Sequence, residues 1–303
     1  MKTPLVSVII LAYQHANYIK ECLDSILMQK TNFDFEIIVG EDESTDGTRQ
    51  ICIDYANKYP DKIELHLRSR KNVIYINGSP TGRYNFIESL KAAKGKYIAI
   101  SDGDDYWIDE NKLQKQVDVF QKYPDCIICG GRTKTWIEEK SEFSVTTPSL
   151  EKKITCMTPV EFFYLKDWVK TTSRMVPKEL MLKIPSDYLR DYRLVHYLLS
   201  TNPNGTFRCL NEVVAVYRQH AGGIYSGAHP VALLQIEFKS LQLIAKLYSD
   251  ERAAFMKHIL AAVSLKLYSS KEISLLKRMY YGSYYLFLLI CRFFNKGINT
   301  KLN

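Results

Sequence analysis

Apolar residues in the first 130 positions form short continuous runs, which alternate with stretches of helical spacing. The runs are rich in Val and Ile, as expected for strands buried on both faces of a sheet. We predict strands at Leu5–Tyr13, Phe35–Gly40, Ile63–Leu67, Tyr97–Ser101 and Cys126–Gly130. We predict helices at Asn17–Gln29, Thr45–Lys58, Arg83–Lys94 (closed by Gly95) and Lys112–Tyr123. This alternation predicts an α/β protein with a mostly parallel, doubly wound sheet.

The pattern changes in the second half of the chain. Asn72–Gly82, rich in Gly and Pro, is predicted to be a loop. Residues 131–227 mix helical patches with strand-like runs, and residues from His229 to about Phe294 have helical spacing. The patches are Pro159–Leu165 and Asp191–Ser200, and the runs are Phe207–Leu210 and Val213–Tyr217. We therefore expect one domain over residues 1–227 and a helical C-terminal extension over residues 228–303.

Composition narrows the class of protein. Of 303 residues, 46% are hydrophobic and 24% charged, which is ordinary for a soluble globular protein. Seven irregularly spaced cysteines argue against a disulfide framework and for a reducing compartment. Cys126 and Cys129 are interpreted as buried strand residues rather than a redox or zinc site. The N-terminus does not resemble a signal peptide, so we expect a cytoplasmic protein.

The net charge of +8 is concentrated in the extension. Residues 228–303 contain eleven Lys/Arg and four Asp/Glu, so residues 1–227 are nearly neutral and nucleic-acid binding is not expected. Within residues 275–295, an aromatic and apolar stretch lies between Lys277 and Arg292. It is too short to span a bilayer but suits a helix lying on an anionic membrane surface. The alternative is a helix that packs on the rest of the protein.

The residues with candidate chemical roles lie directly after predicted strands. The run Tyr97–Ser101 is followed by Asp102-Gly103-Asp104-Asp105. Hard divalent cations prefer carboxylate oxygens, and Mg²⁺ is commonly held by one or two carboxylates plus substrate phosphates. Sites in parallel sheets lie beyond the carboxyl ends of the strands, where Tyr13 and Asp42 also fall. The alternative is a polar turn that caps the helix starting near Asp109.

Two common nucleotide-binding signatures are missing from the sequence. No G-x-G-x-x-G follows the first predicted strand, and no G-x-x-x-x-G-K-[ST] occurs anywhere in the chain. Both a dinucleotide-dependent oxidoreductase and a P-loop nucleotide hydrolase are therefore poorly supported.

Four ordered motifs resemble the family-two inverting glycosyltransferases of the GT-A fold. They are Val6–Tyr13, Glu36–Thr48, Asp102–Trp107 and Glu212–Ser226, and the last resembles a bacterial cell-surface polysaccharide branch of the family. The resemblance covers about residues 4–227. It implies metal-dependent transfer of a hexose or N-acetylhexosamine from a nucleoside-diphosphate donor, expected to be a UDP-sugar. The implied acceptor is a hydroxyl of a growing surface glycan of capsule, O-antigen or lipopolysaccharide type, or a lipid-linked oligosaccharide, at the inner face of the cytoplasmic membrane.

The resemblance also implies roles for individual residues. The nucleotide and donor would be bound by Ala12, Tyr13, Asp42, Arg83, Asn85, Asp102 and Asp104. Mn²⁺ or Mg²⁺ would be held by Asp104, Asp105 and His220, with the division of labour among the three acids left open. Asp42 would accept the imide N–H of uracil or the equivalent group of another base; otherwise it caps the following helix. Glu41 stands where the family usually has Asp.

The implied catalytic base is Asp191, with Asp187 and Asp167 as competitors. Trp107 either forms the floor of the sugar site or packs in the core. Two other functions stay open: a non-catalytic sugar-nucleotide or glycan-binding module on a GT-A scaffold, and a sugar-phosphate nucleotidyltransferase. The acidic cluster with Asp191 and His220 argues against the first. The second needs a Gly-rich basic loop after the first strand, where residues 13–17 read Tyr-Gln-His-Ala-Asn.

Overall fold

A computed structural model describes residues 3–76, 79–144, 154–159, 169–189, 191–223, 229–270, 272–275 and 277–286. The chain divides into two compact units, Met1–His220 and Ala221–Asn303. This division falls close to residue 227, where the sequence pattern changes.

The first unit is built on a central sheet with the strand order β10-β12-β8-β11-β6-β1-β2-β3. The strands are β1 (Val6–Ala12), β2 (Phe35–Glu41), β3 (Ile63–Leu67), β6 (Tyr97–Asp102), β8 (Cys126–Ile137), β10 (Ile154–Met157), β11 (Met175–Pro177) and β12 (Thr206–Gln219). Strands β3, β2, β1 and β6 are parallel to one another, as β8 is to β12. Strands β10 and β11 run antiparallel to their neighbours. The mostly parallel α/β sheet predicted from the sequence is confirmed.

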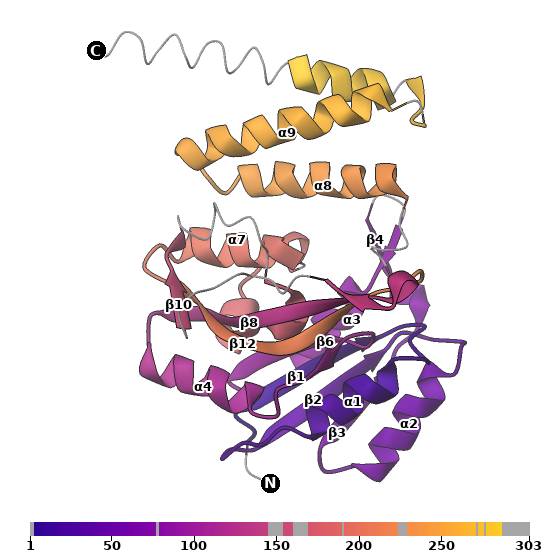
Figure 1. The fold of residues 1–303 in the computed structure, drawn as a ribbon, viewed down its shortest axis with the longest axis vertical. Helices are drawn as coiled ribbons and strands as arrows, with labels where there is room; N and C mark the ends of the chain where they lie inside the picture. The colour runs from indigo at the N-terminus through magenta and orange to yellow at the C-terminus, as the bar shows by residue number, and fades with distance from the viewer. Residues whose placement is uncertain are drawn as a thin grey trace. The chain divides into compact units, whose positions relative to one another are not determined.

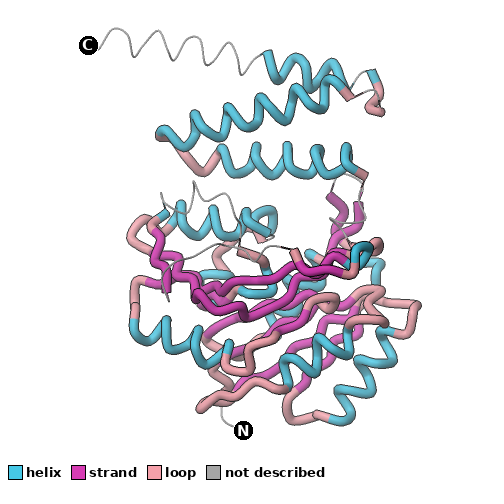
Figure 2. The backbone as a smooth tube through the Cα atoms, viewed as in Figure 1, coloured by secondary structure: helices cyan, strands magenta, loops and turns pink. Residues whose placement is uncertain are grey.

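Helices cover both faces of this sheet (Figures 1 and 2). They include α1 (Ile19–Leu27), α2 (Thr48–Lys58), α3 (Arg83–Ala92), α4 (Lys112–Lys122), α6 (Lys178–Met181) and α7 (Asp191–Thr201). Alternate residues of β1 enter different cores: Val8 and Ile10 join the cluster that contains Ile26 of α1, whereas Ile9 joins the cluster that contains Phe86 of α3. Burial on both faces explains why the strand is a continuous apolar run.

Some predicted elements differ from the structure. The predicted loop Asn72–Gly82 contains a small antiparallel pair, β4 (Ile74–Ile76) and β5 (Ser79–Thr81), whose three-residue strands are too short to stand out among turn residues. The runs Phe207–Leu210 and Val213–Tyr217 form the single strand β12, with a shift of register between Leu210 and Val213. The polar residues Asn211 and Glu212, which separate the two apolar runs in the sequence, lie at this irregularity. Of Pro159–Leu165, all but Pro159 lies outside the described residues.

Gly95 does not cap α3 as predicted. The helix ends at Ala92, Ala93 is extended, and Gly95 does not adopt the left-handed conformation of a helix C-cap. Instead, its backbone N–H donates to the Ser7 hydroxyl at 2.7 Å. A Cβ at this position would lie 2.4 Å from the Ser7 nitrogen, so glycine is required for close approach of two backbones.

The second unit contains α8 (Pro230–Ala245), α9 (Glu251–Ser269) and a helical segment at residues 277–286. The ring of Phe238 on α8 contacts the rings of Tyr281 and Tyr284, with centroids 5.2 and 5.0 Å apart. Tyr281 is buried, so the described part of the terminal segment packs on α8. None of the helices in the described ranges is long and apolar enough to cross a membrane.

Candidate active site

The carboxyl ends of three parallel strands bring the predicted site residues to one edge of the sheet. Ala12, the last residue of β1, lies opposite Glu41 of β2, and Leu11 lies opposite Asp102 of β6. Tyr13 and Asp42 continue from these strand ends, and the Asp42 N–H donates to the Ala12 carbonyl at 3.0 Å. The register therefore gathers residues that are up to 91 positions apart in the sequence, such as Leu11 and Asp102.

The acidic turn leaves β6 at Asp102 and re-enters the sheet at β7 (Tyr106–Trp107). The Gly103 N–H donates to the Leu11 carbonyl at 2.8 Å, and the Asp105 N–H donates to the Asp102 carbonyl at 3.1 Å. A Cβ on Gly103 would lie 2.7 Å from Nδ1 of His15, so only glycine allows the turn to pass this close. The turn thus holds Asp104 and Asp105 in fixed and different directions.

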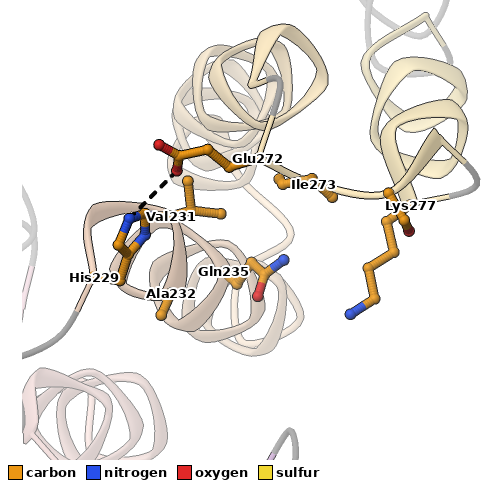
Figure 3. A pocket seen from close by; sticks show the side chains of 8 residues that line it. His229, Val231, Ala232, Gln235, Glu272, Ile273 and Lys277 are labelled. Carbon is orange, nitrogen blue, oxygen red and sulfur yellow. Dashed lines mark hydrogen bonds and ion pairs between the residues drawn. The ribbon is translucent and has the colours of Figure 1, made fainter.

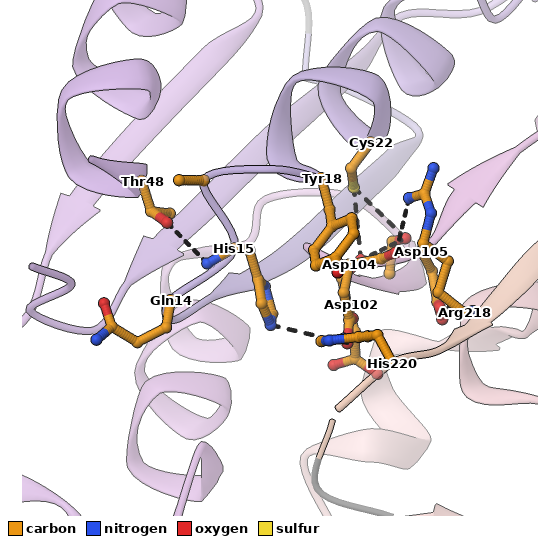
Figure 4. A network of polar contacts seen from close by, with 12 residues as sticks. Gln14, His15, Tyr18, Cys22, Thr48, Asp102, Asp104, Asp105, Arg218 and His220 are labelled. Carbon is orange, nitrogen blue, oxygen red and sulfur yellow. Dashed lines mark hydrogen bonds and ion pairs between the residues drawn. The ribbon is translucent and has the colours of Figure 1, made fainter. Parts of the chain in front are cut away.

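Asp104 meets two histidines (Figure 4). Its Oδ2 lies 3.0 Å from Nε2 of His220, which follows β12, and 3.8 Å from Nε2 of His15, which follows β1. Burial opposes ionisation of Asp104, but the hydrogen bond to His220 and the charges of both histidines outweigh it and lower the pKa of the carboxyl. Burial lowers the pKa of His15, and the Asp104 charge partly counteracts it. The site is therefore built around an ionised carboxylate.

Asp105 points away from this pair. It is buried, and its Oδ1 accepts a hydrogen bond of 3.0 Å from the backbone N–H of Arg218. Burial, together with the neighbouring charges of Asp104 and Asp102, raises the pKa of Asp105 well above its usual range. Among the residues whose placement is described, no group of three or more His, Cys, Asp and Glu side chains is arranged to hold a metal ion.

Arg218, which lies in the Glu212–Ser226 motif, supports the acidic turn from β12. Its Nη1 donates to the Asp104 carbonyl at 2.8 Å, its guanidinium lies 4.4 Å from the centre of the Tyr106 ring, and it forms an ion pair with Glu21 of α1. The motif was recognised from the sequence, but this role was not, since it depends on contacts between segments far apart in the chain.

The predicted nucleobase end lies beside β2. The Asp42 carboxyl is buried; Oδ2 accepts from Nη1 of Arg70 at 2.9 Å, and Oδ1 has no hydrogen-bond partner among the residues that the structure describes. Burial raises the pKa of Asp42, and the Arg70 charge counteracts this effect. The Arg70 guanidinium also lies 3.9 Å from the centre of the Tyr13 ring. Arg70 follows β3 outside any motif, so no sequence signal pointed to it.

Glu41, the residue that departs from the family pattern, is fully buried. It accepts from the Ser44 N–H at 2.7 Å and forms an ion pair with Arg49 of α2. The longer carboxylate is thus used within the protein to hold the loop that presents Asp42.

Arg83 and Asn85 both lie buried at the start of α3. Nη1 of Arg83 lies 3.1 Å from the carboxylate of Asp187, one of the competitors for the catalytic base. The Asn85 amide donates to the Gly40 carbonyl at 2.7 Å, which fixes the end of β2. Their predicted donor contacts stay predictions, but both side chains already bond within the protein.

The remaining predictions concern the acceptor side and the core. Asp191 is the first residue of α7, but its side chain, like the whole of Asp167, lies outside the described residues. Trp107 is buried and its Nε1 donates to the Thr172 carbonyl at 2.9 Å, so it packs in the core rather than forming the floor of an open site. Cys126 and Cys129 are free and buried, as predicted.

A separate hollow of about 590 Å³ lies within the second unit (Figure 3). His229 and Glu272 line it, with Nε2 and a carboxylate oxygen 3.5 Å apart, together with Gln235 and Lys277. The ion pair is exposed to solvent, where such pairs contribute little. This hollow contains none of the predicted site residues.

Comparison with known proteins agrees with this architecture. Residues 7–186 match the family described as Glycosyl transferase family 2. The uncharacterised protein Rv1520 of Mycobacterium tuberculosis is 30% identical over 225 residues, which is 74% of this chain and 61% of that protein. The chain therefore spans less than two thirds of the length of this relative.

Two solved structures share the fold. Staphylococcus aureus TarS in complex with UDP-GlcNAc superposes with a TM-score of 0.57 at 20% identity, covering 85% of this chain and 71% of TarS. The mannosyltransferase PcManGT from Pyrobaculum calidifontis, in complex with GDP-Man and Mn²⁺, superposes with a TM-score of 0.55 at 16% identity, covering 98% and 89%. The sheet and its acidic edge thus define a transferase scaffold of the GT-A type. The chain belongs to glycosyl transferase family 2.

Proposed function

We propose that this chain is a metal-dependent, inverting glycosyltransferase that moves a hexose or N-acetylhexosamine from a nucleoside diphosphate, most simply a UDP-sugar, to a hydroxyl of a surface glycan. The observation that carries the proposal is the Asp104–His220 pair at the same sheet edge as Asp42 and Tyr13. The end with Asp104 and His220 suits a charged diphosphate, and the end with Asp42 and Tyr13 suits a flat base.

The nucleobase proposal rests on Asp42. A buried carboxylate oxygen without a partner is unusual, because buried polar atoms are nearly always hydrogen-bonded. The imide N–H of uracil would satisfy Oδ1 with a charge-assisted bond while Arg70 keeps Oδ2. The ring of Tyr13, 39% exposed, offers a flat surface for the base once Arg70 shifts from its face.

The residues present fit a divalent cation that is coordinated partly by the protein and partly by the substrate. Asp104 offers a carboxylate oxygen, the kind of ligand that Mn²⁺ and Mg²⁺ prefer, and the imidazole nitrogen of His220 lies 3.0 Å from it as a further possible ligand. The phosphates of the donor would complete the coordination, so a closed set of protein ligands is not required. A bound cation would neutralise charge developing on the departing diphosphate. Asp105, engaged with Arg218, would hold the turn.

The direct test is a panel of nucleotide sugars incubated with the protein and either Mn²⁺ or Mg²⁺. We expect slow, metal-dependent hydrolysis of one donor, in which water takes the place of the missing acceptor hydroxyl. UDP-sugars should react faster than GDP-sugars. A protein that neither binds nor hydrolyses any member of the panel would contradict the proposal.

We predict that Asp42→Ala weakens UDP binding by about 1–3 kcal/mol, the scale of a lost hydrogen bond to a charged group. Calorimetry in the presence of Mn²⁺ measures this directly. Asp54→Ala is the matched control, since it removes an exposed acid from α2 and should leave the affinity unchanged. Equal UDP affinity of wild type and Asp42→Ala would remove Asp42 from the base site.

We further propose that the second unit attaches the enzyme to the cytoplasmic face of an anionic membrane, where a lipid-linked acceptor would reside. Its helical segment 277–286 packs Tyr281 and Tyr284 on Phe238 and exposes Met279 and Leu286, and Leu275 shortly before this segment is exposed as well. The seven-residue spacing of Met279 and Leu286 places these two side chains on one helical face, away from Phe238. The excess of basic residues in 228–303 supports an anionic partner. The predicted stretch beyond residue 286 lies outside the described residues.

We predict that replacing Leu275, Met279 and Leu286 by Ser reduces binding to vesicles of anionic lipid by roughly tenfold or more, because burying one large apolar side chain contributes about 1.5–3 kcal/mol. These changes are preferable to deletion of residues 275–303, which would uncover Phe238. Co-sedimentation at low and high salt, with zwitterionic vesicles as control, measures the effect. If the wild-type protein does not bind anionic vesicles, the exposed side chains of Leu275, Met279 and Leu286 have another function.

A further inference from the structure

A tyrosine at the start of α1 connects three distant parts of the first unit. The Tyr18 hydroxyl donates to the carboxylate of Glu138, with distances of 2.9 and 3.0 Å to its two oxygens. Glu138 begins a short 3₁₀ helix (Glu138–Lys140) directly after β8. The two residues are 120 positions apart, so this bond forms only when the sheet is assembled.

The ring of Tyr18 lies against His220. The two ring centroids are 4.6 Å apart, with an angle of 48° between the ring planes (Figure 4). His220 is 7% exposed, and its Nε2 lies 3.0 Å from the Asp104 carboxylate. Tyr18 therefore stands behind the imidazole, whose nitrogen reaches the acidic turn.

The backbone around His220 gives a reason for such support. Ala221, Gly222 and Gly223 follow it directly, and glycine allows the chain more conformations than any other residue. Two residues earlier, Arg218 is held by Glu21 and by the Asp104 carbonyl. The Tyr18 ring is thus a second contact from the start of α1, placed where β12 ends and a glycine-containing sequence begins.

We propose that Tyr18 is a positioning residue that holds the His220 imidazole against Asp104, and that Glu138 holds Tyr18 in place. The ring supplies the contact surface, and the phenol–carboxylate bond prevents the ring from turning away. The proposal rests on the proposed function only in assigning the Asp104–His220 pair to the donor diphosphate; the positioning itself does not depend on it.

The first experiment measures the release of His220 without any ligand. Mass spectrometry follows carbethoxylation of His220 by diethyl pyrocarbonate, with His66 as the internal reference. We expect Tyr18→Phe and Glu138→Ala to raise the rate at His220 by roughly three- to tenfold, the scale of one net hydrogen bond. Glu138→Gln, whose amide oxygen still accepts the phenol, should stay near wild type. Tyr18→Leu should have the largest effect.

Tyr55→Phe is the matched control. The Tyr55 hydroxyl on α2 donates to Asp24 on α1 at 2.7 Å, an exposed phenol–carboxylate bond of the same kind between other elements. Its loss should leave His220 protected. Unchanged reactivity of His220 in both Tyr18→Phe and Glu138→Ala would overturn the proposal, as would an equal increase in Tyr55→Phe.

The second experiment measures binding of UDP, and of GDP in a parallel series, at increasing Mn²⁺ concentration. If wild type binds a nucleoside diphosphate, Tyr18→Phe should need several-fold more Mn²⁺ for half-saturation, whereas Tyr55→Phe should not. Release of His220 without any change in this requirement would leave the positioning by Tyr18 standing and would overturn the assignment of the Asp104–His220 pair to the donor diphosphate. If wild type binds neither nucleotide while His220 is released as expected, the positioning by Tyr18 stands and the proposed function fails.

Discussion

Asp104→Asn should abolish sugar transfer and metal-dependent donor hydrolysis, with a loss of at least about 10²–10³-fold, the usual effect of removing one preorganised electrostatic group. Asn retains the shape of the side chain and can still bond to His220. It lacks the negative charge that would hold a cation beside the diphosphate. The loss should therefore fall on metal-dependent binding and chemistry together.

The same substitution should reduce stability only modestly. The pKa of Asp104 is lowered in the folded protein, so the ionised carboxylate stabilises the fold at neutral pH. That contribution is complete above the pKa of the unfolded chain and is lost as the pH falls through the lowered folded value. Asp104→Asn removes it at neutral pH, and thermal unfolding should show a small decrease in melting temperature.

Asp118→Asn on α4 is the matched control, because Asp118 is exposed and its carboxylate accepts a hydrogen bond from Gln114 of the same helix. EDTA treatment of the wild type should reproduce the loss seen in Asp104→Asn. Full turnover in metal-free buffer would show that no metal serves the reaction as proposed, and an active Asp104→Asn enzyme would show that the carboxylate does not.

Asp191→Asn should reduce transfer by about 10²–10⁴-fold, the contribution typical of a general base, while donor affinity stays close to that of the wild type. Inversion requires a base that removes the acceptor proton on the face opposite the leaving group. The Asn side chain keeps the size of the carboxylate but cannot take that proton. Calorimetry with UDP and transfer to a panel of sugar and lipid-linked acceptors separate binding from chemistry.

Asp187→Asn provides the comparison for Asp191. Asp187 precedes α7, and its carboxylate is paired with Arg83 at 3.1 Å, so its oxygen is already engaged. We expect Asp187→Asn to keep most of the transfer activity. If Asp187→Asn is inactive while Asp191→Asn transfers sugar normally, the base has been assigned to the wrong residue. If both are active, Asp167 becomes the candidate.

The sequence alone determined the alternating strands and helices of the N-terminal half, because the apolar pattern of each segment there agrees with its place in the buried sheet. Continuous Val and Ile runs such as Val6–Ala12 are required wherever helices cover both faces of a sheet, so the strands could be located without a structure. Acidic residues directly after such runs had to meet at one edge, since parallel strands end on the same side. The family motifs therefore predicted where the site lies.

Only the tertiary structure decided what each acidic side chain contacts. Asp104 and Asp105 are neighbours in the sequence, yet one faces His220 and the other the Arg218 backbone, because β12 reaches the turn from more than 110 residues away. Arg70 and Tyr18 were likewise missed, since each owes its place to partners in other elements. Spacing along the sequence shows which residues follow the same strand. Burial and the pairing of distant segments determine which of their atoms come into contact.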